Sequence, residues 1–119
     1  MINNTLSYNG FHHQVITMRA GEKEIPVGAP VSLSSNGECV PCSSGQRFIG
    51  ICLCQREDLV SVQVEGYAEA GYIGAAPSYG FEKMSASDYS GVEVAADDTA
   101  DTYRVIKLDQ VNKTVGFIL

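Results

Sequence analysis

Hydrophobic and polar residues alternate with a period of two along much of this chain. The clearest example is the segment 60–70, where valine, glycine and alanine occupy the even positions while polar residues and one tyrosine occupy the odd positions. Successive side chains of a β-strand point to opposite faces of a sheet, so this pattern predicts a strand with one buried face. Helical periodicity is almost absent, which favours an all-β fold.

Further strands are expected where short apolar segments end at glycine, proline or asparagine. The Ser-Asn-Gly sequence at 35–37 predicts a hairpin between strands at 31–33 and 38–40, because Asn-Gly accepts the positive φ angles of a type I′ turn. A C-terminal hairpin is expected from strands at 103–108 and 114–119. The other expected strands lie at 12–17, 48–54 and 79–84.

Two segments of the chain are similar to each other. Val-Gly-Ala-Pro at 27–30 and Ile-Gly-Ala-Ala-Pro at 73–77 each precede a strand, a turn that contains glycine, and a return strand. Either a structural repeat or chance explains the similarity. Many short strands with Gly and Pro corners predict a small β-barrel or a compact sandwich. We expect a single β-barrel domain at 11–119, preceded by an extended N-terminal arm at 1–10.

Composition limits the classes of function. The chain has 119 residues, of which 45% are hydrophobic and 18% charged, as is typical of one globular domain. The net charge is −6 and the eight Lys and Arg are never adjacent, which disfavours nucleic acid and anionic membranes as partners. No apolar segment reaches about twenty residues, so no transmembrane helix is expected. Residues 1–10 lack the features of a secretory signal, which predicts synthesis in the cytoplasm.

The four cysteines admit three interpretations: a zinc site, a disulfide, or buried reduced thiols. If residues 38–42 and 47–54 form a hairpin, Cys39 shares a face with Cys52 and Cys54, whereas Cys42 points to the opposite face. At most three thiolates therefore converge, and cytoplasmic synthesis disfavours a disulfide. We expect reduced thiols that serve packing, with no metal and no cofactor.

Other candidate catalytic or metal-binding groups are also disfavoured. His12 and His13 are neighbours, and neighbours on a strand point to opposite faces, so they cannot share one metal ion. No serine or cysteine lies in the sequence context of an activated nucleophile, and we expect no enzyme. The acidic segment 97–101 lacks the spacing and central glycine of an EF-hand loop, which favours a solvated turn over a calcium site.

Half of the aromatic residues lie within residues 67–89, a span rich in glycine, alanine and serine. Tyrosine suits protein interfaces because its ring is apolar and its hydroxyl is polar. These rings either form an interface or fill the core and cap the end of the barrel. A carbohydrate platform usually adds tryptophan, which this chain lacks. The aromatic residues in this span are Tyr67, Tyr72, Tyr79, Phe81 and Tyr89.

Several segments follow one another along nearly the whole chain: a polar arm at 1–10, a stretch at 19–33 with Gly-Ala-Pro, Arg-Phe-Ile-Gly-Ile at 47–51, the alternating strand at 60–70, and an acidic segment at 92–101 before the final strand pair. This order resembles that of small head decoration proteins of tailed bacteriophages, also called capsid cement proteins. The resemblance implies a compact β-barrel or β-tulip, often trimeric, that binds an assembled capsid and reinforces it without catalysis or a cofactor.

The resemblance further implies that the arm adds a strand to a neighbouring subunit. We therefore expect a virion structural protein on the capsid exterior, assembled in the host cytoplasm, with the major capsid protein lattice as partner and a homotrimer as oligomeric state. The alternatives are a fibre base or tail component, which the four cysteines leave open, a small β-sandwich module that binds glycan or peptide, and a small metal-dependent enzyme. The expected partner-binding residues are Ile2, Leu6, Tyr8, Tyr72, Tyr79 and Phe81.

Overall fold

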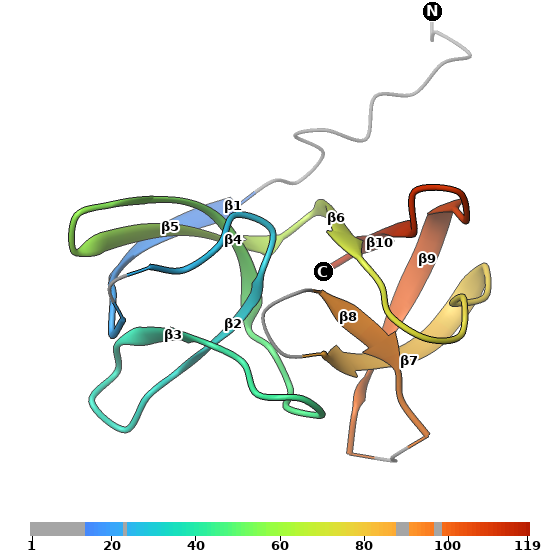
Figure 1. The fold of residues 1–119 in the computed structure, drawn as a ribbon, viewed down its shortest axis with the longest axis horizontal. Helices are drawn as coiled ribbons and strands as arrows, with labels where there is room; N and C mark the ends of the chain where they lie inside the picture. Colours follow the sequence, from blue (N-terminus) through green and yellow to red (C-terminus); the bar gives the residue numbers. More distant parts are fainter. Residues whose placement is uncertain (1–13, 23, 88–90, 97–98) are drawn as a thin grey trace, which may run out of the picture.

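The computed structural model describes residues 14–22, 24–87, 91–96 and 99–119, and all the regular elements in these ranges are β-strands (Figure 1). They form two antiparallel sheets of five strands each, which confirms the expected all-β class. The proposed arm at 1–10 lies outside the described residues. In chain order the strands are β1 (Gln14–Arg19), β2 (Pro30–Leu33), β3 (Cys39–Pro41), β4 (Gly50–Arg56), β5 (Leu59–Glu65), β6 (Tyr67–Gly71), β7 (Gly80–Ala86), β8 (Val92–Val94), β9 (Asp101–Asp109) and β10 (Thr114–Ile118).

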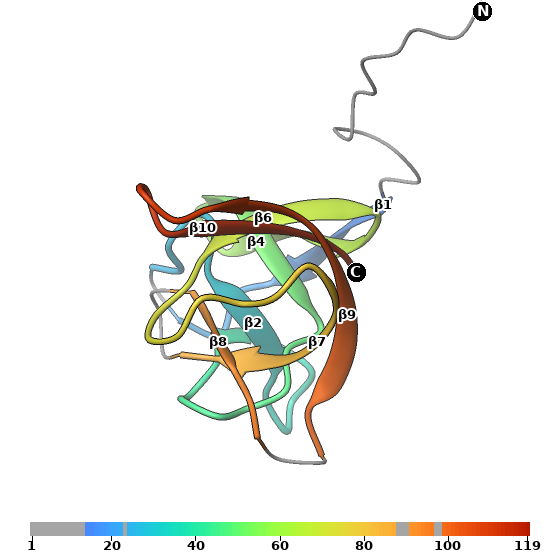
Figure 2. The same cartoon turned by 90° about the vertical axis from the view of Figure 1, so that its right-hand side faces the viewer.

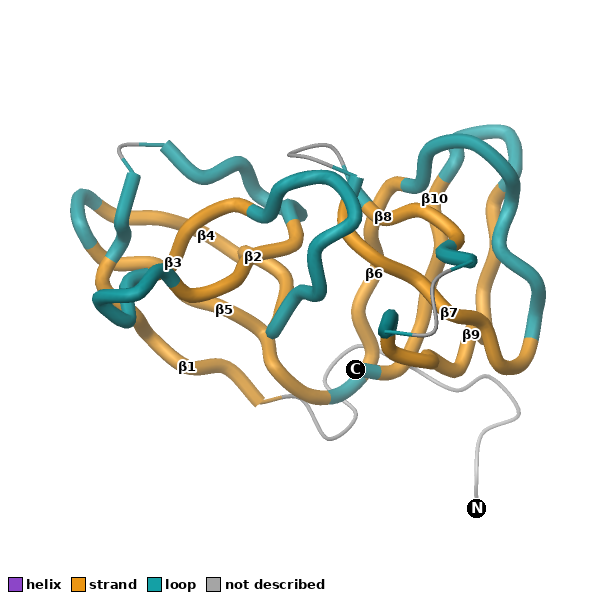
Figure 3. The backbone as a smooth tube through the Cα atoms, turned by 90° about the horizontal axis from the view of Figure 1, so that it is seen from below, coloured by secondary structure: helices purple, strands orange, loops and turns teal. Residues whose placement is uncertain are grey.

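Each half of the chain forms one of the two sheets. The first sheet has the strand order β1-β5-β4-β2-β3, and the second has the order β6-β10-β9-β7-β8. Figures 1 and 3 show the sheets as two lobes that lie side by side, with β5 leading into β6 between them. Gly66 forms this joint with a φ of 92°, and its carbonyl accepts a hydrogen bond of 2.9 Å from the N–H of Leu119.

The second sheet repeats the topology of the first. Adding five to each strand number of the first sheet gives the strand order of the second. The residue after the first strand of each half also forms an equivalent isolated parallel bridge, Ala20 with Cys39 and Tyr72 with Val92. The two similar sequence segments precede β2 and β7, which occupy equivalent positions, so their similarity reflects a structural repeat.

Neither sheet closes into a barrel. The edges of the first sheet are β1 and β3, and those of the second are β6 and β8. In the described part of the chain, a single bridged residue pair links the two edges of each sheet. The strands pair only within their own half, so the observed arrangement is two sheets in a sandwich-like fold. Figure 2 shows the strong curvature of β9, which bends from β10 towards β7.

A loop of the first half completes the core of the second half. Phe48, in the loop between β3 and β4, is only 5% exposed and stacks on Tyr103 with 5.1 Å between ring centroids. The same ring meets Phe117 edge-on at 6.3 Å. Backbone hydrogen bonds join this loop to β7, since Gly45 N–H donates to the Ala86 carbonyl at 2.7 Å. The two sheets therefore share one hydrophobic core cluster.

A second, smaller cluster consists of residues from the first half alone. Its members come from β2 to β5 and from the loop between β1 and β2, and Met18 of β1 packs against it from the side. Each curled sheet thus encloses apolar side chains, and the first does so without residues from the second. The buried members are Ile25, Val31, Cys39, Cys52, Val60 and Val62.

Candidate functional site

The expected partner-binding residues have different positions in the structure. Ile2, Leu6 and Tyr8 lie outside the described residues. Tyr79 and Phe81 are 64% and 77% exposed at the start of β7, as a binding surface requires. The sixth residue, Tyr72, lies in the core.

Tyr72 is 6% exposed and belongs to the larger core cluster, so its assignment as a surface anchor is wrong. It follows β6 directly, where its N–H donates to the Lys113 carbonyl at 3.0 Å and its backbone bridges Val92. These contacts hold the residue between two parts of the second sheet and bury its ring. Among the other aromatic residues of this span, Tyr67 is 5% exposed and Tyr89 lies outside the described residues.

Local contacts fix the segment that carries Tyr79 and Phe81. Pro77 is fully buried, and the N–H of Ser78 donates to Glu82 Oε1 at 2.8 Å. Gly80 has a φ of 93°, a backbone conformation that favours glycine. Two exposed aromatic side chains are therefore presented on backbone that is already held in place.

Phe81 is the first of four side chains that lie in a row across the outer face of the second sheet. In the strand pairing, Phe81 lies opposite Arg104, Arg104 lies opposite Ile118, and Ile118 lies opposite Tyr67. Directly paired residues of antiparallel strands project from the same face, so these four side chains form one row over β7, β9, β10 and β6. We call this set the outer row.

Tyr67 closes one end of the outer row. Its ring lies over Gly116, where any side chain would overlap the ring, and its hydroxyl donates to Glu69 Oε2 at 2.6 Å. Lys107 Nζ lies 3.3 Å from the same oxygen. The hydrogen bond from Tyr67, and then the contact with Lys107, hold the pKa of Glu69 below its ordinary value. This end of the row is polar and ordered, whereas the end at Phe81 is apolar and exposed.

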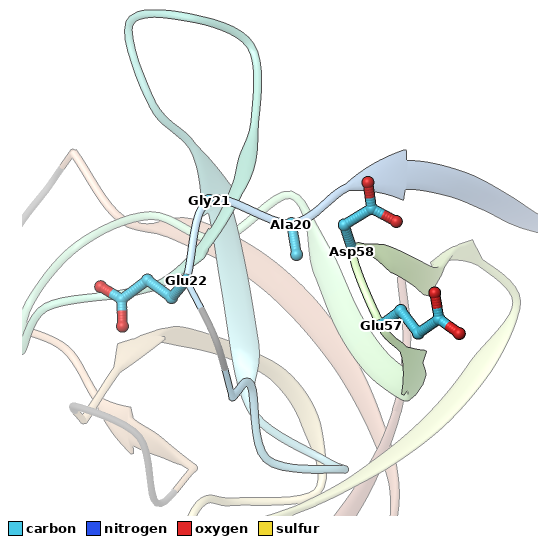
Figure 4. A pocket seen from close by; sticks show the side chains of 5 residues that line it. All are labelled: Ala20, Gly21, Glu22, Glu57 and Asp58. Carbon is cyan, nitrogen blue, oxygen red and sulfur yellow. The ribbon is translucent and has the colours of Figure 1, made fainter.

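A surface hollow of about 340 Å³ lies beside the end of β1 (Figure 4). Figure 4 shows that Glu22 points away from Glu57 and Asp58, which both belong to the turn between β4 and β5. Asp58 is paired with Arg19 at 3.2 Å. The carboxylates in this hollow do not converge, so they form no pair for general acid and base catalysis. The lining residues are Ala20, Gly21, Glu22, Glu57 and Asp58.

The cysteines are divided among three environments. Cys39 and Cys52 belong to the smaller core cluster and Cys42 to the larger one, so Cys42 is separated from the other two as expected. The expected hairpin of 38–42 with 47–54 is wrong, because β3 and β4 both pair with β2 and not with each other. The prediction that Cys54 shares their face is wrong, because Cys54 is exposed. A β-bulge at Leu53 places Cys52 and Cys54 opposite consecutive residues of β5, so these two side chains point to opposite faces.

Within the described ranges, no group of three or more His, Cys, Asp and Glu side chains could hold a metal ion. Burial raises the pKa of both Cys39 and Cys42 to about 11, so these thiols keep their protons near neutral pH. The thiolate is the metal-binding form of cysteine, and the environment of these two side chains disfavours it. The other candidate ligands His12, His13, Asp97 and Asp98 lie outside the described residues.

No protein-family model, no curated protein and no solved structure matches this chain. No helix long and apolar enough to cross a membrane occurs in the described part of the chain. The candidate functional site is therefore defined by geometry. It consists of Phe81, Arg104 and Ile118 of the outer row together with Tyr79, since Tyr67 is only 5% exposed. Arg104 and Ile118 were not expected from the sequence.

Proposed function

We propose that this chain is a virion structural protein that binds the outside of an assembled phage capsid, as a head decoration protein. The observation that carries the proposal is the pair of aromatic side chains, Tyr79 and Phe81, exposed by 64% and 77% at the start of β7 in the second sheet. The order of segments along the sequence, which resembles that of capsid cement proteins, supplies the class of partner.

The outer row has the composition of a protein-binding surface. Aromatic residues and arginine are enriched at interfaces, and Phe81 and Arg104 lie directly opposite each other. The proposed partner is the major capsid protein lattice, and the proposed location is the capsid exterior after assembly in the host cytoplasm. Insertion of Phe81 into an apolar pocket of the lattice would bury its ring, while Arg104 would meet an acidic group or a carbonyl at the rim.

One subunit covers only a small patch of a capsid, so useful affinity would come from several subunits that bind together. A homotrimer, which the family resemblance implies, would supply this multivalency. The arm residues Ile2, Leu6 and Tyr8 are proposed as additional anchors. Contacts of this kind are mainly apolar, so moderate salt should weaken binding only slightly.

The test uses undecorated phage heads, mixed with the protein in about 0.15 M and 0.5 M salt, followed by a count of bound copies. A variant with Tyr79→Ser and Phe81→Ser should bind about 30-fold more weakly, because a central aromatic anchor contributes about 2 kcal/mol or more. The matched control carries Val27→Ser and Val111→Ser, which remove side chains that are 74% and 91% exposed elsewhere. The control should bind like the unchanged protein.

Two results would count against the proposal in different ways. If the Tyr79 and Phe81 variant binds heads as well as the Val27 and Val111 control, the outer row is not the contact surface. If the unchanged protein binds no head at all, the function itself is refuted. Binding to tails in place of heads would favour the alternative of a tail component.

A further inference from the structure

Gly66 is the joint between the two halves of the chain, and it is the single residue between β5 and β6. Its φ of 92° turns the chain from the first sheet into the second. Glycine adopts such a conformation readily, whereas residues with a side chain rarely do. The direction of the second half relative to the first therefore depends on the conformation of one residue.

The sequence around this joint also fits a straight strand. Val60 and Val62 belong to the core cluster of the first half, Ala68 and Ala70 belong to the cluster in the second half, and all of them occupy even positions. Even positions of one extended strand share a face. If Gly66 became extended, β5 and β6 would form one continuous strand, 59–71, in which the same side chains keep a common face.

A buried side chain holds the joint in its bent form. Gln63 is 4% exposed, and its Nε2 donates to the Glu65 carbonyl at 3.1 Å and to the Tyr67 carbonyl at 2.6 Å. These two carbonyls lie on either side of Gly66, whose own carbonyl accepts from the N–H of Leu119. In a straight strand, Tyr67 would lie about 13 Å along the chain from Gln63, beyond the reach of its amide. The bent and straight forms therefore differ in a few hydrogen bonds and in one φ angle.

The other described contacts between the halves are noncovalent. Every described strand pairing lies within one half. Across the halves, Phe48 enters the larger core cluster, and the N–H of Ala86 donates to the Gln46 carbonyl at 3.0 Å. Arg47 forms a two-pronged ion pair with Asp101 of β9, with distances of 2.8 and 3.1 Å. None of these contacts requires that the two halves belong to the same chain.

We infer that two copies of this chain exchange halves. In this dimer both joints are extended, and the first half of each copy packs against the second half of the other through the contacts just described. The closed monomer predominates at low concentration because its two halves are already linked. A higher concentration, or a joint that disfavours the bend, shifts the equilibrium towards exchange. This inference does not depend on the proposed capsid function.

Refolding from urea at about 5 to 500 µM chain, followed by sedimentation, tests the inference, because during folding each half finds its partner in its own chain or in another. The unchanged protein should form a dimer whose fraction rises with concentration. Gly66→Val should raise the dimerisation constant about 100-fold, since a positive φ costs valine about tenfold and the dimer relieves this cost at two joints.

The matched control is Gly28→Val. Gly28 has a φ of 87°, and a Cβ added there would meet no atom within 4 Å, so valine introduces similar backbone strain in the loop before β2. Its dimerisation constant should equal that of the unchanged protein. A second joint variant, Gln63→Met, removes both hydrogen bonds across Gly66 without backbone strain. It should raise the dimerisation constant about tenfold, and it serves if Gly66→Val does not fold.

Charge reversal distinguishes exchanged halves from association of intact monomers. Arg47→Glu and Asp101→Arg each bring like charges together between the halves of a homodimer. When the two variants are refolded together in the background of either joint variant, a mixed dimer with exchanged halves contains one natural and one reversed ion pair. Mixed dimers, counted by native mass spectrometry, should therefore form in excess over random mixing.

Three results would overturn the inference: no dimer of the unchanged protein at the highest concentration, joint variants that dimerise no more than Gly28→Val, or mixed dimers at the level of random mixing. Association through another surface, as in a trimer, would not respond to the joint variants and is recognised in this way. These measurements use no phage heads, so their failure is separate from a failure of the proposed capsid binding.

Discussion

Phe48 joins the two halves of this chain, and its replacement by alanine measures how strongly they depend on each other. The ring belongs to the first half of the sequence but is 5% exposed within the core of the second. It contacts Tyr103 face to face and Phe117 edge-on. Alanine would leave a cavity between the sheets and remove both ring contacts.

The expected loss in the free energy of unfolding is large for a domain of this size. Truncation of a buried phenylalanine to alanine lowers the free energy of unfolding by about 3–5 kcal/mol, and each aromatic contact accounts for about 0.5–1.5 kcal/mol. For a chain of 119 residues, about 1 kcal/mol corresponds to about 4 °C in Tm, so Phe48→Ala should lower Tm by about 12–20 °C. Phe48→Leu, which keeps most of the volume, should cost about 1–2 kcal/mol and stays measurable if the alanine variant does not fold.

Calorimetry and urea unfolding, followed by far-UV circular dichroism, measure these changes. The control is Phe81→Ala, which removes a ring that is 77% exposed and should change stability by less than about 0.5 kcal/mol. The unchanged protein should unfold in one transition, and Phe48→Ala should shift that whole transition. Two separate transitions, or a midpoint for Phe48→Ala equal to that of the control, would show that the sheets are energetically independent.

Three further predictions concern the outer row and the thiols. Gly116→Ala should lower the free energy of unfolding by about 1–3 kcal/mol, because its methyl group would overlap the Tyr67 ring, and urea unfolding should show a smaller cost in a Tyr67→Phe background. Iodoacetamide at pH 8 should alkylate Cys54 first, by mass spectrometry, since Cys39 and Cys42 are buried with a pKa of about 11. Because folding raises these two pKa values from 9.0, the unfolded state loses the protons first, and stability should fall as pH rises from about 9 to 11.

The sequence predicts most strands correctly but not where one sheet ends and the next begins. The alternation at 60–70 predicts one strand, whereas the structure has two, β5 and β6, in different sheets. The alternation continues through Gly66, whose positive φ redirects the chain without interrupting the pattern of buried and exposed positions. A period of two reports which face a side chain occupies and carries no information about which strands pair.

The same limit explains the errors at the candidate site. Tyr72 and Tyr79 lie in similar sequence contexts, but one ring is enclosed where β6 meets β8 and the other is exposed before β7. Arg104 and Ile118 are separated by fourteen positions in sequence and become neighbours only through the β9–β10 pairing. Cys54 was misplaced because a β-bulge leaves no clear signal in a run of small and apolar residues.

The four edges of the two sheets differ in how they are protected. Unprotected edges promote aggregation, and short length or burial are common ways to protect them. The edges β3 and β8 have three residues each, and β6 is buried at three of its five positions. Only β1 among the described edge strands is both long, with six residues, and exposed along most of its length. The fold therefore protects three of its four edges by short length or burial and leaves most of β1 exposed.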